Sequence, residues 1–538
     1  MGNSNNMNRR LTLGDTVTYS LGSLGREISN NLIVVFFMAY LTFVIGLNGI
    51  VLGVLFCLAK VWDAVNDIIM ATWINNTRSK FGRYRPWIFF GTILNVFAIV
   101  AMFAPVGQVV SSKVGLYFYY MGMYVLWGMT FTAVDVPFWS MIPTIANSTH
   151  ERNKVSSLAR LIGGFGGFII STVGTLVLDK LGKYNMTSYL WLAVVAGGIF
   201  AVFMMIMLAC NKERYELPAE TISFKQVAQV FKSNDQVMPY AISYVLFVTG
   251  TTIALYQILY IFIYEGEIGT LSYNHYGLFT ALACTGQGIA MFFYPWFTKK
   301  LRAEKVYGAN YFMAIGGMLF LFLIFFLLKP QYGSMSPTAT QVINVIIVSL
   351  AGSLLMTSNG LNQIGSTVMI ANIVDYGEYK TGLRTDSLMF SVQTLLTKFA
   401  GAIAMLVLGI GVQVSGLPVV DTVTNTVSGE ITTTMMTILR VFMFLIPIPF
   451  VVAGYLVYRF KYTLYGEKVE KIKAELDVKH LGQEQAAETA VADGTVDVAV
   501  DGVVAEAVAQ QLADETLDAS EPQAEPATAE QDDAHADE

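Results

Sequence analysis

The chain alternates long apolar runs with short polar connections, and this alternation is its dominant pattern. Apolar runs of about 18 or more residues with few charges predict helices that cross a membrane. We predict twelve spans, at 27–48, 50–75, 86–106, 114–146, 157–178, 187–209, 236–264, 273–297, 306–328, 340–374, 386–413 and 432–458. The pattern therefore predicts an all-α polytopic membrane protein.

A polar middle segment, NKERYELPAETISFKQVAQVFKSND over 211–235, divides the spans into two sets of six. It is too polar to cross a membrane, so we predict a cytoplasmic linker with a short amphipathic helix. Residues 1–210 and 236–460 then form two six-helix halves. Similar basic connections, NNTRSKFGRYRPW and FTKKLRAEKVYG, follow the second and eighth spans and indicate a duplicated unit. The substrate site is then expected between the halves, near the membrane midplane.

The positions of Lys and Arg predict the orientation of the chain, because cytoplasmic connections carry an excess of both. One set of connections holds Arg9, Arg10, Arg78, Lys80, Arg83, Arg85, Arg152, Lys154, Lys212, Arg214, Lys299, Lys300, Arg302, Lys305, Lys380, Arg384, Arg459 and Lys461. The alternate set holds only Lys113, Lys180, Lys183 and Lys329. We therefore expect both termini on the cytoplasmic side of the cell membrane.

Composition supports a membrane protein and separates off the end of the chain. Only 13% of the 538 residues are charged, whereas soluble proteins are about 25% charged. From residue 481 the chain holds 16 Asp and Glu and no Lys or Arg, which leaves 33 basic against 23 acidic residues elsewhere. We predict that 461–538 is a cytoplasmic tail, disordered from about 481, because such composition buries little apolar surface.

Two carboxylates lie within the second predicted span, where each must be paired or hydrated. Asp63 and Asp67 are four residues apart, so a helix places them on one face with Asn66 beside them. This set of oxygen ligands suits a hard cation such as Na⁺, and a proton could titrate it. Without His or Cys, it does not resemble a transition-metal site.

A third acid, Asp135, lies in another apolar span. Thr132 precedes it by one turn, and Pro137 frees backbone carbonyls by interrupting the helix. We predict that Asp135 and Thr132 complete the cation site. The alternative is a set of buried aspartates paired with basic residues of neighbouring helices, for example Lys60.

Polar and aromatic residues in the same half suggest a sugar site. Glu27 opens the first predicted span next to Asn30 and Asn31, and carboxylates and amides bind sugar hydroxyls. Trp139 could stack on the apolar face of a sugar ring. The alternatives are a terminal Glu that reaches the membrane surface and a Trp that packs against lipid.

Two cations, Arg160 and Lys398, interrupt apolar segments and must find a carboxylate or water. Lys398 follows Gln393 and Thr394 by about one turn, and we expect it to pair with the aspartates; a purely structural ion pair is the alternative. The stretch IVDYGEYKTGLRTDS over 373–387 has mixed charges that could close a cytoplasmic gate, or form an ordinary solvated loop. The candidate gate residues are Arg78, Arg83, Arg85, Asp375, Glu378 and Arg384.

Four motifs in order, WDAVNDIIMATWINNTRSKFGRYRPW, GMTFTAVDVPFWSMIP, ERNKVSSLARL and ANIVDYGEYKTGLRTDSLMFSVQTLLTK, resemble the glycoside–pentoside–hexuronide:cation symporters, of which the melibiose carrier is the type member. The resemblance extends over about 11–465 and implies a major-facilitator fold that couples sugar uptake to Na⁺ or H⁺. By motif position, Asp63, Asn66, Asp67 and Thr132 resemble the family's cation site, and Asp135 resembles the acid at the junction of the cation and sugar sites. Glu27, Trp139 and Arg160 resemble sugar-site positions, and Lys398 matches the family's membrane lysine, with Gln393 and Thr394 before it. We predict cation binding by Asp63, Asn66, Asp67, Thr132 and Asp135, and sugar binding by Glu27, Asn31, Asp135, Trp139, Arg160, Gln393, Thr394 and Lys398.

The chain departs from the pattern of that family at a few positions. Ile68 and Ala71 replace a usual Pro and Gly, Glu27 replaces an Asp, and Gln363 replaces an aromatic residue. These departures leave the sugar open.

We expect a secondary active transporter, functional as a monomer and without a cofactor, that imports a glycoside with Na⁺ or H⁺ by alternating access. A galactoside or other di- or oligosaccharide is the first candidate, and Asn66 favours Na⁺. The alternatives are a pentoside or glucuronide symporter, a symporter for a non-sugar amphiphile and a sugar sensor. The partners are the sugar and the bilayer, not nucleic acid. An enzyme is disfavoured because the four His are dispersed.

Overall fold

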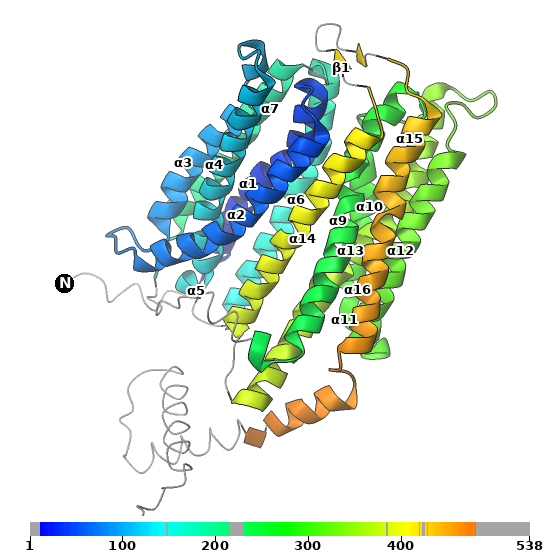
Figure 1. Ribbon diagram of the computed structural model, residues 1–538. Helices are drawn as coiled ribbons and strands as arrows, with labels where there is room; N and C mark the ends of the chain where they lie inside the picture. The colour runs from blue at the N-terminus through cyan, green and yellow to red at the C-terminus, as the bar shows by residue number, and fades with distance from the viewer. Residues whose placement is uncertain are drawn as a thin grey trace, which may run out of the picture. The chain divides into compact units, whose positions relative to one another are not determined.

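The computed structural model describes residues 11–146, 149–183, 185–214, 231–382, 386–418, 420–421, 426–427, 429–476 and 478–479. The chain divides into two compact units, Met1–Leu464 and Tyr465–Glu538. The first unit is a bundle of long helices (Figure 1). In the second unit a helix covers 467–476, and the tail predicted to be disordered lies outside the described residues.

The first part of the bundle is built from α1 to α7. Their bounds are α1 Leu13–Leu32, α2 Gly49–Asn76, α3 Arg85–Met102, α4 Lys113–Ser140, α5 Ile142–Ile145, α6 Thr149–Leu181 and α7 Met186–Cys210. Two π-helical segments, η1 Ile33–Phe37 and η2 Tyr40–Val44, continue α1, and a short 3₁₀ turn η3 lies at Val106–Gln108.

The second part begins after the middle segment. Its bounds are α9 Val237–Glu267, α10 His275–Phe292, α11 Tyr294–Leu301, α12 Ala303–Leu327, α13 Pro337–Thr381, α14 Asp386–Val414, α15 Thr433–Arg440, the π-helical η4 Val441–Leu445 and α16 Pro447–Lys461. A small antiparallel pair, β1 Val420–Asp421 and β2 Thr426–Val427, lies between α14 and α15.

The first span begins at Leu13 and not at residue 27, so the predicted start was wrong. Thr12 and Asp15 form a capping box that starts α1. The helix then runs through Ser, Gly and Thr residues that are buried in the bundle, so they need not be apolar. Glu27 therefore lies inside a helix and not at its end.

Ten described helical segments are long and apolar enough to cross a membrane, or eleven if the bent pair of α10 and α11 is one span. The 28-residue helix α4, which is rich in Tyr and Trp, is not among them. The all-helical membrane architecture is confirmed, and the count of twelve stays a prediction.

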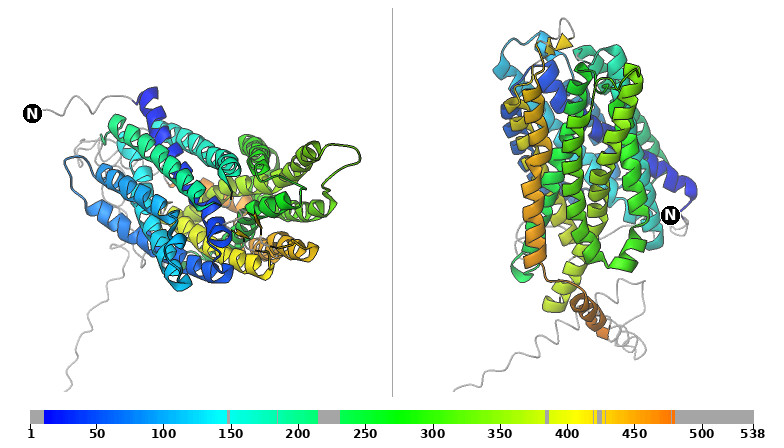
Figure 2. Two further views of the ribbon diagram at one scale, coloured as in Figure 1. Left: turned by 90° about the horizontal axis from the view of Figure 1, so that it is seen from above. Right: turned by 90° about the vertical axis from the view of Figure 1, so that its right-hand side faces the viewer.

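Two helix pairs join the parts of the bundle. The second long helix, α2, packs against α14, and α6 packs against α10. The first pair joins a second helix to a fifth, and the other pair joins a fifth helix to a second. Figure 2 shows α14 beside α2 when the bundle is seen from above. This reciprocal pattern is what a duplicated six-helix unit would produce.

We call the end of the bundle where α1 begins and α16 ends the terminal end, and the opposite end the distal end. At the distal end α2 and α14 are in backbone contact: a Cβ atom on Gly409 would lie 2.9 Å from Gly53 Cα. A Cβ on Gly277 of α10 would lie 2.7 Å from Thr172 Cα of α6. Toward the terminal end, α2 and α14 diverge in Figure 1. The two parts therefore meet most closely at the distal end.

Candidate functional site

The two aspartates of α2 lie on one face of the helix, as their spacing predicts. Thr132 of α4 donates a hydrogen bond to Asp67 Oδ1 at 3.1 Å and a weaker one to Asp63 Oδ1 at 3.5 Å. Gly128 of α4 leaves room for the Asp63 carboxylate, because a Cβ there would lie 3.4 Å from Asp63 Oδ1. α2 and α4 thus build an oxygen-rich cluster inside the bundle.

Lys398 of α14 enters this cluster from the other part of the bundle. Its Nζ lies 2.5 Å from Asp67 Oδ2 and 3.1 Å from Asp63 Oδ2. Lys60, on the same helix as the aspartates, places its Nζ 3.7 Å from Asp63 Oδ2. The expected pairing of Lys398 with the aspartates is therefore present. The Lys60 pairing that the alternative reading proposed is present as well.

Asn66 lies beside the aspartates in sequence and is buried. Its Nδ2 has no hydrogen-bond partner, which is costly for a buried amide. The role of Asn66 as a cation ligand stays a prediction.

A second polar cluster contains a residue that the sequence analysis missed. Arg26 of α1 pairs with Asp135 of α4 and with Glu27, the latter at 2.5 Å. Its guanidinium carbon lies 5.2 Å from the centre of the Trp139 ring. A span starting at Leu13 would have marked Arg26 as a cation within the membrane. Asp135 is thus paired with Arg26, whereas Asp63 and Asp67 are paired with Lys398. The membership of Asp135 in the cation site stays a prediction.

The same cluster collects most of the predicted sugar-binding residues. Asn31 donates through Nδ2 to Glu27 Oε2 at 3.0 Å, and Arg160 of α6 lies 5.0 Å from the Trp139 ring centre. On α6, a Cβ at Gly163 would lie 3.1 Å from Glu27 Cγ, so a glycine keeps space beside this carboxylate. Carboxylates, guanidiniums, an amide and an indole face together form a group suited to a polyhydroxylated ring.

The two other predicted sugar residues of α14 make different contacts. Gln393 donates through Nε2 to Ser366 Oγ of α13 at 2.9 Å. Thr394 is exposed and bonds to Phe390 O of its own helix at 3.2 Å. No group of three or more His, Cys, Asp or Glu able to hold a metal ion occurs in the described part of the chain.

The candidate gate residues fall into separate groups. The Glu213 carboxylate accepts hydrogen bonds from the backbone N–H groups of Arg83 and Tyr84, both at 2.8 Å, and of Arg85 at 3.1 Å. The Arg85 guanidinium donates to Leu208 O at 2.7 Å. Glu213 was not predicted; it binds the start of α3, where free N–H groups attract anions.

On the other part of the bundle, Asp235 pairs with Lys380 at 2.9 Å. Lys380 follows the predicted gate residues Asp375 and Glu378 on α13. Arg78 is exposed in the loop after α2. Arg384 lies outside the described residues. The gating role of these side chains remains a prediction.

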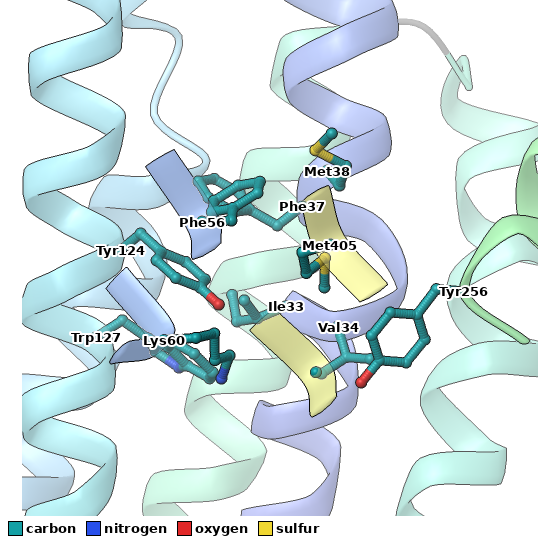
Figure 3. A pocket seen from close by; sticks show the side chains of 11 residues that line it. Ile33, Val34, Phe37, Met38, Phe56, Lys60, Tyr124, Trp127, Tyr256 and Met405 are labelled. Carbon is teal, nitrogen blue, oxygen red and sulfur yellow. The ribbon is translucent and has the colours of Figure 1, made fainter. Parts of the chain in front are cut away.

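A small aromatic cavity lies one to two turns from the aspartates on the distal side, between η1, α2, α4, α9 and α14. Figure 3 shows its lining of Phe37, Phe56, Tyr124, Trp127 and Tyr256 around the Lys60 side chain. Its volume is about 40 Å³, which suits a few water molecules. The cavity can hydrate the Lys60 ammonium, but it is too small for a sugar ring in this form.

Two joined helical parts with an ion cluster across their contact define a membrane transporter of the major-facilitator type. Solved structures share this fold: the nucleoside transporter NupG covers 84% of the chain with TM-score 0.55 and 10% identity, over 100% of its own length. A D-xylose-proton symporter covers 84% with TM-score 0.56 and 14% identity, over 98% of its length. The chain belongs to the MFS/sugar transport protein family, whose model matches residues 18–465.

Several relatives similar to this chain are sugar transporters by name. The isoprimeverose transporter of Lactiplantibacillus pentosus is 26% identical over 74% of this chain and 78% of its own. The lactose permease of Lactobacillus delbrueckii subsp. bulgaricus is 23% identical over 89% of this chain and 74% of its own. The raffinose carrier protein of Pediococcus pentosaceus is 22% identical over 76% and 62%.

These comparisons confirm the resemblance that the motifs indicated. The chain is a sugar transporter of the major facilitator superfamily and not an enzyme.

Proposed function

We propose that the chain imports a di- or oligosaccharide, with a galactoside as the first candidate, together with one monovalent cation. Lactose and raffinose, which name two of the relatives, both contain galactose. The observation that carries the proposal is the ion cluster in which Asp63 and Asp67 of α2 bind Lys398 of α14. This cluster joins the two parts of the bundle through charges that a transported cation can replace.

In the proposed mechanism, the cation binds Asp63 and Asp67 and displaces the Lys398 ammonium. Opposite charges at this distance attract by several kcal/mol even at an effective dielectric constant of about 20. Displacing Lys398 therefore weakens the link between α2 and α14, and the loaded carrier can change its open side. The Thr132 hydroxyl and the Asn66 amide oxygen are proposed as two further ligands of the cation.

The sugar is proposed to bind at the second cluster. The Arg26, Glu27 and Asp135 side chains can exchange their mutual contacts for sugar hydroxyls, and Trp139 can stack on the ring. The two clusters share α4, on which Thr132 and Asp135 lie one turn apart. Movement of this helix would couple the cation to the sugar.

Na⁺ is the first candidate for the cation because the Asn66 amide is a neutral oxygen ligand that a proton does not need. A proton remains the alternative. We further propose that the carrier lies in the cell membrane as a monomer with both termini in the cytoplasm. Under this orientation the distal end of the bundle is outside.

The test is uptake by purified carrier in proteoliposomes, with labelled lactose, raffinose, a pentoside, a glucuronide and a lysolipid. Each substrate is offered with a Na⁺ gradient, a pH gradient, or neither, and protein-free liposomes are the control. We expect accumulation of a galactoside driven by Na⁺. If only the pentoside, the glucuronide or the lysolipid accumulates, that compound is the substrate and not a galactoside. If only the pH gradient drives accumulation, the coupling ion is H⁺ and not Na⁺. Absence of any counterflow would favour a sensor.

A further inference from the structure

The distal end of α9 contains a buried ion pair that lies apart from both polar clusters. The Glu265 side chain is 0% exposed, and the side chain of its partner, Arg440 of α15, is 8% exposed. Thr270 also donates its hydroxyl to the Glu265 carboxylate. Burying two charges costs several kcal/mol per ion, and pairing returns only part of it. A membrane helix that needed only stability would do as well with apolar residues here.

The ion pair connects several elements around the end of α9. The Arg440 guanidinium lies 5.1 Å from the ring centre of Phe326 on α12. The turn after α9 is fixed to α13, because Asn344 donates to Thr270 O at 2.6 Å. The distal end of α9 is therefore held by α12, α13 and α15, all in the same part of the bundle.

The same end of α9 forms much of the distal contact with the first part of the bundle. Tyr260 and Thr42 share a hydrogen bond of 3.2 Å between their hydroxyls. The Phe43 ring lies 5.0 Å from the ring of Tyr260 and 5.2 Å from the ring of Tyr264. Two residues beyond Glu265, the Glu267 carboxylate pairs with another element of the first part.

That outermost contact is an ion pair of 2.6 Å between Lys183 and Glu267. One side of the distal contact is π-helical, since Thr42 and Phe43 lie in η2. Arg440, which holds the end of α9, is followed directly by the π-helical η4. Such turns are frequent at functional sites.

We propose that Glu265 and Arg440 are positioning residues for a distal gate, formed where Tyr260, Tyr264 and Glu267 meet the first part of the bundle. The pair fixes the direction of the α9 end, so that the gate residues meet their partners each time the distal end closes. Apolar packing would hold the helix less specifically, since it is not directional. The inference rests on alternating access in this family, and not on the sugar or ion proposed above.

The test measures the distance across the distal end. In a background with Cys57, Cys210 and Cys284 replaced by Ala, Val114→Cys of α4 and Thr338→Cys of α13 carry spin labels; both positions are exposed at the distal ends of their helices. Labelled carrier in nanodiscs gives the populations of closed and open distal ends. Thermal unfolding and sugar counterflow are measured on the same variants.

The informative variant is Glu265→Gln with Arg440→Met, which removes both charges and leaves neither buried charge alone. We expect unfolding temperature close to wild type, a closed population about tenfold lower relative to the open one, and reduced counterflow. Closed populations and counterflow at wild-type values would overturn the proposal. A purely structural pair would move only the unfolding temperature.

A milder variant keeps the test decisive if the double variant does not fold. Glu265→Asp preserves both charges but shortens the carboxylate side chain, so it should fold and still open the distal end. A wild-type distance distribution in Glu265→Asp would then reject the proposal. The matched control is Lys329→Gln, an exposed charge at the distal end outside the gate contacts. Surface charges contribute little, so we expect less than a twofold change.

Discussion

At the scale of single residues, Asp67 is the carboxylate most tightly tied to the other part of the bundle. Its Oδ2 lies 2.5 Å from Lys398 Nζ, and its Oδ1 accepts from Thr132. We predict that Asp67→Asn abolishes gradient-driven accumulation while leaving sugar equilibration, because the neutral amide no longer exchanges Lys398 for a cation. Uptake with and without the gradient, in the same proteoliposomes, measures both.

The matched control is Asp235→Asn at the terminal end. The hydrogen bond from Lys380 holds the pKa of the Asp235 carboxyl well below its usual value. Because its pKa is lowered, Asp235 stays ionised until the pH falls far below neutral. It does not titrate near pH 7, so Asp235→Asn should accumulate sugar with the wild-type pH profile there. Full gradient-driven accumulation by Asp67→Asn would show that Asp67 does not belong to the coupling site.

Lys398 occupies the place that the cation is proposed to take, so its removal should strengthen cation binding. We predict that Lys398→Met raises cation affinity about tenfold, since the competing ammonium is gone, while coupled accumulation is lost. Binding of Na⁺ measured by calorimetry, and uptake measured in parallel, separate the two effects. Lys398→Arg, which keeps the charge, is the control; unchanged cation affinity in the Met variant would show that Lys398 does not compete.

The residue scale also shows what the sequence could reveal. The Asp63 and Asp67 pair could be predicted because four-residue spacing sets a common face in any helix. Arg26 could not be predicted, because the first span predicted from the apolar pattern begins one residue after it. Glu265 was missed for a similar reason: it lies one residue beyond a predicted span end, where a charge is ordinary.

At the scale of elements, the apolar pattern located most of the long helices, because many of their exposed side chains are apolar. It failed for the first turns of α1, whose buried Ser and Gly residues pack against α6 and α7 and so carry no apolar signal. Contacts between elements were beyond the pattern altogether. That Thr132 meets Asp67, whereas Asp135 meets Arg26, depends on how α1 and α2 pack on α4.

The start of α3 yields a stability prediction. Gly82 has φ of +105°, and a Cβ there would lie 2.6 Å from the Glu213 Cδ. We predict that Gly82→Ala destabilises the carrier by about 1–3 kcal/mol, through backbone strain and loss of the Glu213 contacts with α3. Thermal unfolding in detergent measures the loss.

Gly401 supplies the comparison, because a Cβ on this glycine of α14 would meet nothing within 4 Å. Gly401→Ala should therefore unfold within about 0.5 kcal/mol of wild type. Equal unfolding temperatures for Gly82→Ala and Gly401→Ala would show that the Glu213 contact does not stabilise the fold.

A second element, the seam between α2 and α14, tests closure. A Cβ on Gly409 would meet the Gly49 carbonyl oxygen and the Gly53 backbone. We predict that Gly409→Ala opens the distal end and lowers sugar counterflow about tenfold, because two helices can no longer approach to backbone contact. The Val114 and Thr338 label distance and counterflow check this, again with Gly401→Ala as control on the same helix. Unchanged closure in Gly409→Ala would show that α2 and α14 can accommodate the added methyl group.

At the scale of the whole molecule, the distal end is closed by two seams that belong to one reciprocal arrangement. α2 meets α14 at Gly409, and α6 meets α10 where Gly277 contacts Thr172, whose hydroxyl bonds to Gly277 O at 3.4 Å. If each part of the bundle moves as a rigid body, both seams must close in the same motion. Two distant sites are then coupled through the motion itself, although they share no contact.

This coupling gives a prediction that independent seams would not satisfy. Gly277→Ala alone should open the distal end as Gly409→Ala does, and the double variant should lose little more than either single one. Effects at distant, independent sites would instead add in free energy, so their fold-changes would multiply. Label distances and counterflow for the two single variants and the double variant decide between these outcomes. Multiplying losses would show that α2 with α14 and α6 with α10 close separately.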